Sequence, residues 1–149
     1  MRLRLGVQRE CRGQRLPSAA RIAEWARAAL AGSGPGTAEV TVRLVDEAES
    51  AALNRRYRGK RNATNVLSFA YDLPRGVAGL AGDLVICAPV VARESAEQGK
   101  PVRAHWAHMV VHGIMHLRGY DHVHETDAQV MEALEVRVLK RLGIPNPYA

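Results

Sequence analysis

Strands are the first elements that the pattern of hydrophobic and polar positions predicts. Aliphatic and polar residues alternate over residues 2–8 and again over residues 40–44. Successive side chains of a strand point to opposite faces, so this alternation is typical of half-buried strands, and we expect the first one at a sheet edge. Residues 66–71 and 84–87 are rich in β-branched and aromatic side chains and predict two more strands. The proline and glycines at 74–82 predict a loose, mobile connection between them.

Helical spacing of apolar residues dominates the rest of the chain. The first stretch with this spacing runs from Ser18 to Ala31, and a GSGPG segment ends the predicted helix. Asp46 and Glu49 have the spacing of a capping box, which predicts a helix that begins there and continues to about Arg56. Three further helices are expected in the second half, at about 89–98, 102–117 and 126–142.

The last predicted helix has an apolar line that we expect to face the core. Its members are Val130, Met131, Leu134, Val138 and Leu142. The short tail after Gly143 is expected to fray. The order of the elements predicts a single α+β domain over residues 1–149, with one small mixed β-sheet and helices packed on a face of it.

The composition is typical of a soluble globular protein, with 47% hydrophobic and 24% charged residues. Apolar stretches are short and interrupted, and residues 1–11 lack the apolar run of a secretory signal, so we expect neither a membrane span nor export. Cys11 and Cys87 are too few for a disulfide framework, and Cys87 lies in an apolar run where we expect a buried thiol. These features predict a cytoplasmic protein.

Basic residues outnumber acidic ones by 21 to 15, which gives a formal charge of +6 and an isoelectric point near 9.9. Such a balance favours a polyanionic partner, because basic side chains release counterions from a phosphate backbone. Five basic residues fall within 55–61, around Gly59 and between a predicted helix and a predicted strand. A charge run is often only a solvated face, but a loop in this position can also fold over a nucleic-acid substrate.

Three histidines in the segment HGIMHLRGYDH have the spacing of metal ligands. His112 and His116 are four residues apart and project from one face of a helix. Gly119 can end that helix in a left-handed conformation and return the chain, so that His122 meets the other two. Three imidazoles suit a divalent transition metal and leave a coordination position for water or substrate, as catalytic sites do. We therefore predict a metal site at His112, His116 and His122.

Neighbours of this motif have alternative interpretations. A lone histidine on an apolar helix is usually a core residue. That interpretation is harder to argue here, because three of the six histidines have the spacing of metal ligands. His108 lies one helical turn before His112 and can orient a ligand, contact substrate or simply lie on the helix surface. Asp121 can orient a ligand or act as a base.

The histidine spacing is similar to that of the metzincin proteases, whose motif is HExxHxxGxxH. Gly113 stands where those proteases have a glutamate, which takes a proton from the attacking water. No HExxH segment occurs elsewhere in the chain. A peptidase would therefore need a different base.

Three sequence blocks together resemble the YbeY family of bacterial metal-dependent endoribonucleases. The first is HMVVHGIMHLRGYDH at 108–122, followed by MEALE at 131–135. The second is LNRRYRGKRNATNVLSF at 53–69, and the third is GDLVIC at 82–87. They occur in the family's order and spacing, so the similarity covers roughly residues 38–140.

This resemblance implies a single-strand-specific endoribonuclease that acts in 3′-end maturation of 16S ribosomal RNA and in ribosome quality control. It implies zinc as the usual metal, the small ribosomal subunit as partner and no small-molecule cofactor. It also points to Arg58 as a catalytic residue. The chain departs from the family at Arg61, where an acidic residue is common, and at Ala63, where proline is common. Both lie beside the expected substrate loop.

The chemistry of Arg58 agrees with a phosphate site. Its planar guanidinium can hold two phosphate oxygens and stabilise the additional negative charge of a transition state. Alternatively, Arg58 only caps the preceding helix at its last carbonyls. Asn65 can likewise hold the turn before the next strand instead of binding substrate. The further candidates for substrate binding are Lys60, Thr64, Asn65, Ser68 and His108.

The function that we expect is metal-assisted hydrolysis of an RNA phosphodiester, with Arg58, His112, His116 and His122 as the catalytic residues. Two alternatives stay open at this point. One is a non-catalytic ribosome-assembly factor with a structural metal, and the other is a metallopeptidase with another base. The sequence also leaves open whether water or the RNA 2′-hydroxyl is the nucleophile.

Overall fold

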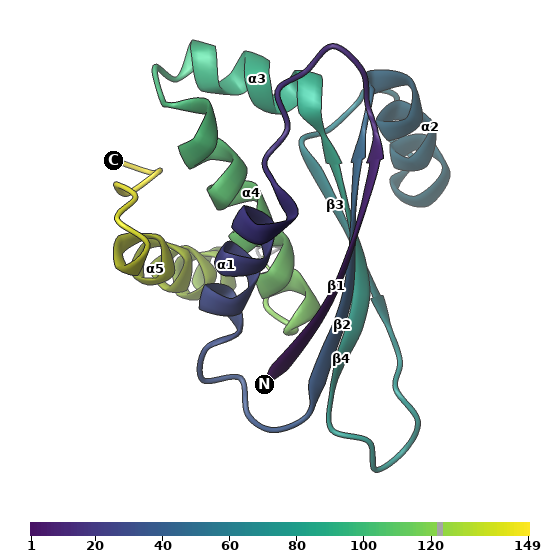
Figure 1. Cartoon of the computed structure of the whole chain (residues 1–149), viewed down its shortest axis with the longest axis vertical. Coiled ribbons are helices and arrows are strands. Elements are labelled where there is room, and N and C mark those ends of the chain that lie inside the picture. Colours follow the sequence, from purple (N-terminus) through teal and green to yellow (C-terminus); the bar gives the residue numbers. More distant parts are fainter. Residues whose placement is uncertain (122–123) are drawn as a thin grey trace.

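In a computed structural model that describes residues 1–121 and 124–149, four strands form one mixed sheet. They are β1 (Arg2–Glu10), β2 (Thr37–Val45), β3 (Val66–Tyr71) and β4 (Gly79–Cys87). The strand order is β1-β2-β4-β3, with β3 antiparallel to β4 and the other neighbours parallel (Figure 1). β1 and β3 are therefore the edges, and the predicted edge position of the first strand is confirmed.

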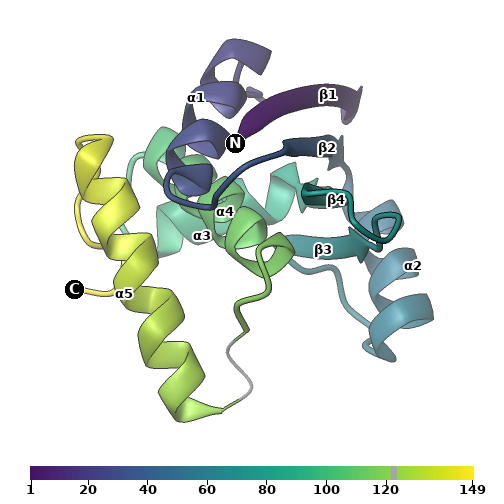
Figure 2. The same ribbon diagram turned by 90° about the horizontal axis from the view of Figure 1, so that it is seen from below.

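Helices cover both faces of this sheet. In the described residues they are α1 (Ala19–Leu30), α2 (Glu47–Arg58), α3 (Ala88–Glu97), α4 (Val102–Leu117) and α5 (Glu125–Arg141). α1 and α4 lie on one face with α5 behind them, whereas α2 lies on the opposite face (Figure 2). The single α+β domain is confirmed. The expectation of one covered face is wrong for α2, because its Leu53 packs against the hydrophobic cluster that contains Val85, on the opposite face of the sheet (Figure 2).

β4 is longer than the sequence pattern predicted. It begins at Gly79 rather than Leu84, because its first half pairs with both neighbouring strands. Ala81, for example, lies opposite Tyr71 of β3. Part of the predicted loose connection is therefore strand.

The start of α2 also differs in detail. Asp46 is its N-cap residue, as predicted, but makes no side-chain cap. The Asp46 carboxylate instead accepts a hydrogen bond from Cys11 Sγ at 3.0 Å, and Glu49 forms an ion pair with Arg43 at 2.8 Å. The predicted capping box is wrong, because both side chains have tertiary partners.

The buried thiol and the absence of a membrane span were both expected from the composition. Cys87 is buried at the end of β4, as predicted. Within the described part of the chain, no helix combines the length and the apolar character that crossing a membrane requires.

α5 and the tail are packed differently from the pattern's prediction. Met131 is buried as expected, but Val130 is 50% exposed and Glu135 is completely buried. The apolar line of α5 therefore contains a carboxylate at its centre. The tail after Gly143 does not fray, because Ile144 packs into the main core.

Candidate metal centre and substrate cleft

α4 carries three histidines on one face. His108, His112 and His116 follow one another at four-residue steps, which a helix places one above the next. The helix ends at Leu117, and Gly119 follows with a φ of +98°, a conformation that favours glycine. The Gly119 N–H donates to the His116 carbonyl at 3.0 Å and so closes the last turn. The predicted helix end at Gly119 is confirmed.

The imidazoles of His112 and His116 have a geometry that fits a metal. Their Nε2 atoms lie 3.2 Å apart, and both side chains line the same cleft. Two nitrogen ligands of a tetrahedral zinc ion, each about 2.0–2.1 Å from the metal, are roughly 3.3 Å apart. The third predicted ligand, His122, lies outside the described residues, so its part in the site stays a prediction.

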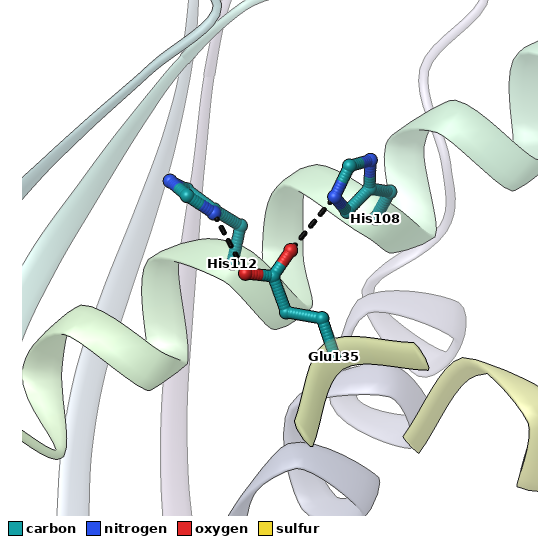
Figure 3. A group of neighbouring side chains, drawn as sticks. All are labelled: His108, His112 and Glu135. Atoms are coloured by element: carbon teal, nitrogen blue, oxygen red, sulfur yellow. Dashed lines mark hydrogen bonds and ion pairs between the residues drawn. The ribbon is translucent and has the colours of Figure 1, made fainter. Parts of the chain in front are cut away.

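Glu135 of α5 extends its carboxylate between two histidines of α4 (Figure 3). Its Oε2 lies 3.1 Å from His112 Nδ1, and its Oε1 lies 2.8 Å from His108 Nε2. The donor atoms of these three residues all lie within 4.8 Å of one another, so they form a group that can hold a metal. The described residues therefore offer two candidate positions for a metal, one on either side of the His112 ring.

Hydrogen bonds hold Glu135, His108 and His112 together. Burial alone would raise the pKa of Glu135, but hydrogen bonds from His108 and His112 outweigh it and lower this pKa to about 2. The ionised carboxylate accepts a hydrogen bond from the Nδ1–H of His112, which leaves the lone pair of that ring on Nε2, the atom that faces His116. Carboxylates bonded in this way fix the tautomer and orientation of metal-binding histidines. This arrangement favours the His112–His116 side for the metal and an orienting role for Glu135.

His108, His112 and His116 form a histidine row along α4. His108 lies on the buried side of this histidine row. It is 8% exposed, and it is absent from the lining of the cleft. Among the described residues its Nδ1 is buried with no partner, whereas its Nε2 is hydrogen-bonded to Glu135. Of the interpretations open from the sequence, the structure favours the orienting one.

A cleft of about 890 Å³ opens beside His112 and His116. Its walls are the edge strand β3, the last turn of α2 and the end of α4 with the residues that follow it. Segments that are far apart in the sequence therefore share one cavity with the two histidines. The other residues singled out from the sequence that line it are Arg58, Thr64, Asn65, Ser68 and Asp121.

Arg58 is the last residue of α2 and lies exposed at the cleft. The helix is closed without it, because Gly59 adopts a φ of +67° and its N–H donates to the Arg55 carbonyl at 3.1 Å. Across residues 1–121 and 124–149, the Arg58 guanidinium forms no hydrogen bond or ion pair. The helix-capping alternative therefore has no support, and the guanidinium is available to an anion.

The other predicted substrate residues differ in their surroundings. Lys60 is exposed but does not line the cleft. Asn65 Nδ2 donates to Glu94 Oε1 at 3.1 Å, and its Oδ1 accepts from the next backbone N–H at 2.7 Å. Ser68 Oγ lies 3.4 Å from the Gly113 carbonyl. Asn65 thus holds the entry into β3, which was the alternative to substrate binding.

The two departures from the family pattern lie outside the cleft lining. Arg61 is exposed, and Ala63 is half-buried against the hydrophobic cluster beneath α2. Neither contacts the histidine row, so the departures leave the candidate metal site unchanged.

Sequence reasoning missed two residues of the buried side, Glu135 and Tyr148. The Tyr148 hydroxyl donates to Glu135 Oε1 at 2.7 Å. Burial and the neighbouring Glu135 carboxylate raise the pKa of Tyr148, so this hydroxyl stays protonated. A signal for Glu135 was present, because it lies four residues after the buried Met131 on the core line of α5. Nothing in the local pattern pointed to Tyr148.

Position 113 leaves no room for the glutamate of the metzincin motif. Gly113 is buried against β4, and a Cβ there would lie 2.7 Å from Leu84 Cδ2. A side chain at this position would point into the packing between α4 and the sheet. This supports the sequence argument against a protease of that design.

Comparisons with known proteins agree with one another. The family described as Endoribonuclease YbeY matches residues 10–143. A relative named Endoribonuclease YbeY from Methylococcus capsulatus is 59% identical, over 89% of this chain and 87% of its own length. Another of that name from Aromatoleum aromaticum is 58% identical, over 99% and 94%. The fold is similar to the solution structure of TM1509 from Thermotoga maritima, with a TM-score of 0.55 and 23% identity over 93% of this chain and 91% of that one. The chain therefore belongs to the endoribonuclease YbeY family.

Proposed function

We propose that this protein is a metal-dependent endoribonuclease that cuts single-stranded RNA. The observation that carries the proposal is the shared cleft, where two imidazole nitrogens 3.2 Å apart lie with Arg58 in a chain of net charge +6. Membership of the endoribonuclease YbeY family supports the reaction class.

His112, His116 and, by the sequence prediction, His122 would hold the metal, and zinc is the ion that three imidazoles favour. When bound, a divalent ion supplies Lewis-acid chemistry, since it polarises a phosphoryl oxygen and lowers the pKa of water toward neutrality. Glu135 accepts a hydrogen bond from the Nδ1–H of His112 and so directs Nε2 of that ring toward His116.

Arg58 binds the scissile phosphate in this proposal. Its guanidinium has no protein partner among the described residues and lies in the same cleft as the histidines. Two parallel hydrogen bonds from a guanidinium to phosphate oxygens fix the orientation of the phosphate and stabilise charge that develops in the transition state. Asp121 lines the cleft as well and is the candidate for proton transfer.

Tyr57 supports the preference for single strands. Its ring is 56% exposed, lines the cleft beside Arg58 and contacts Phe69 edge-on at 5.2 Å between ring centroids. An unpaired base can stack on such a ring, whereas a base inside a duplex is already covered by its neighbours.

The biological setting follows from the family resemblance. We propose that residues 1–149 act as one endoribonuclease domain in the cytoplasm, in 3′-end maturation of 16S ribosomal RNA and in ribosome quality control, with the small ribosomal subunit as partner. The basic composition agrees with a ribosomal RNA substrate. The specificity for one site would come from the ribosomal setting, because the chain lacks a recognisable module for reading bases.

The experiment that tests this function compares Arg58→Glu with Arg61→Glu. Both variants reverse one charge in the same basic segment, but only Arg58 lines the cleft. We expect Arg58→Glu to lower the rate of cleavage of single-stranded ribosomal RNA by about 10²–10³-fold, as loss of a transition-state donor does. Arg61→Glu should stay within a few-fold of wild type, with zinc content equal in all three proteins.

Equal rates for the two variants would contradict the role of Arg58. Intact RNA with folded, zinc-loaded wild type would contradict catalysis and favour the assembly-factor alternative. A substrate with a 2′-deoxy sugar at the scissile position settles the nucleophile, because undiminished cleavage would exclude attack by the 2′-hydroxyl.

A further inference from the structure

The C-terminal tail returns to the histidine row and is fastened there. The backbone N–H of Ile144 donates to the Leu139 carbonyl at 2.8 Å, and the Ile144 side chain is buried. Lys100 Nζ donates to the Pro147 carbonyl at 2.5 Å. These contacts hold the tail against the beginning of α4 and bring Tyr148 to the site.

The Tyr148 hydroxyl is the third partner of the buried carboxylate. It donates to Glu135 Oε1 at 2.7 Å and lies 3.1 Å from His108 Nε2. The ring also meets the His108 ring edge-on, with 5.3 Å between centroids. Glu135 Oε1 thus accepts from Tyr148 and His108, while Oε2 accepts from His112.

These bonds link the tail to the cleft through a single carboxylate. A carboxylate with one oxygen held by two donors cannot rotate without breaking both hydrogen bonds. Its other oxygen therefore keeps a fixed direction toward Nδ1 of His112. Charge-assisted hydrogen bonds of this kind are stronger than neutral ones, and supporting partners of metal-binding histidines set ring orientation and ligand basicity.

We propose that Tyr148 is a positioning residue of the metal centre: its hydroxyl fixes Glu135, and through Glu135 it sets the direction in which His112 presents Nε2. The inference rests on the proposed function in one respect, that His112 binds the metal. The inference also makes Tyr148 part of the metal site, although this residue does not line the cleft.

A purely structural role for Tyr148 predicts something different. The residue as a whole is 46% exposed, so the ring acts as a partial cover over His108 and only the hydroxyl reaches inward to Glu135. Tyr148→Phe keeps the cover and removes the hydroxyl, whereas Tyr148→Ala removes both. If packing is the whole role, Tyr148→Phe should behave as wild type.

The matched control is Tyr71→Phe. The Tyr71 hydroxyl also donates to a carboxylate, that of Asp83, but this pair lies on β3 and β4 away from the histidine row. Both substitutions therefore delete one tyrosine–carboxylate hydrogen bond at a partly exposed position.

The experiment measures zinc affinity, by competition with a chromophoric chelator, and the visible absorption spectrum of the cobalt-substituted protein. We expect Tyr148→Phe to bind zinc about tenfold more weakly than wild type, at the lower end of the range for outer partners. Its cobalt bands should change in position or intensity, with the thermal midpoint of the metal-free protein close to that of wild type. Tyr71→Phe should match wild type in affinity and spectrum.

Unchanged zinc affinity and cobalt spectrum in Tyr148→Phe would overturn this inference alone, since wild type would still bind metal and cut RNA. A loss seen only in Tyr148→Ala would also overturn it, because it would assign the role to the ring. A folded wild type that binds no metal would overturn both the inference and the proposed function.

Discussion

The histidine row of α4 has two sides that are built differently. Toward the cleft, His112 and His116 bring their Nε2 atoms to 3.2 Å beside Arg58. Away from the cleft, His108 and His112 bond to Glu135, which is completely buried. One side is accessible to a substrate and the other is a closed cluster of hydrogen bonds. Because the His112 ring belongs to both sides, the buried side determines how the open side presents its nitrogen.

Removal of a predicted metal ligand on the cleft side has the largest expected effect. His116→Ala should weaken zinc binding by more than about 100-fold, beyond the range of outer partners, and abolish RNA cleavage. The side chain is only half-buried in the last turn of α4, so the fold should persist. Zinc titration and circular dichroism of the metal-free variant check both statements. Unfolding of His116→Ala would instead indicate a structural metal, as the assembly-factor alternative predicts.

Removing the charge of the buried side should have a smaller effect. Glu135→Gln keeps the shape of the side chain, and we expect it to lower zinc affinity about 10–100-fold. Glu94→Gln is the matched control, because Glu94 is bonded to His105 at the same 2.8 Å distance but has no hydrogen bond to His112. If Glu135→Gln loses zinc as completely as His116→Ala, the metal lies on the buried side.

A third change tests the far wall of the cleft. Tyr57→Ala should weaken binding of a labelled single-stranded RNA by about 1–3 kcal/mol, the contribution of one stacked base. Tyr71→Ala is the control, since the two tyrosines are 56% and 55% exposed but only Tyr57 lines this cleft. Fluorescence anisotropy measures both affinities. Equal losses in the two variants would remove Tyr57 from the proposed substrate path.

The smallest expected effect is the pH dependence that His105 contributes. Burial lowers the pKa of His105 below its ordinary value of 6.5, although the hydrogen bond to Glu94 opposes this. As the pH falls through 6.5, the unfolded chain therefore binds more protons at this site than the folded chain. The stability that neutral His105 contributes is fully present above this pH and decreases below it.

Denaturant unfolding of the zinc-free protein at pH 8 and pH 5.5 measures this contribution. The free energy of unfolding of wild type should fall more between the two values than that of His105→Gln. An identical fall in both proteins would contradict the assignment.

Local spacing explains which parts of the molecule could be predicted. The alternating strands, the helix around His112 and His116 and the turn at Gly119 depend on residues within a few positions of one another. The end of α2 at Arg58 was likewise close to its predicted place. These features were therefore readable from the sequence.

Tertiary packing explains the rest. Glu135 meets His112 from 23 residues away, and Tyr148 meets His108 from 40 residues away. Periodicity shows that α5 has a core line but not which helix that line meets. The capping box at Asp46 failed for the same reason, because Cys11 supplied a partner from a distant strand end.

The most direct measurement is a crystal structure of the zinc-loaded protein with anomalous scattering recorded at the zinc edge. We expect one zinc ion about 2.0–2.1 Å from Nε2 of both His112 and His116, with Glu135 still bonded to Nδ1 of His112. A zinc ion bound between His108, His112 and Glu135 would contradict it.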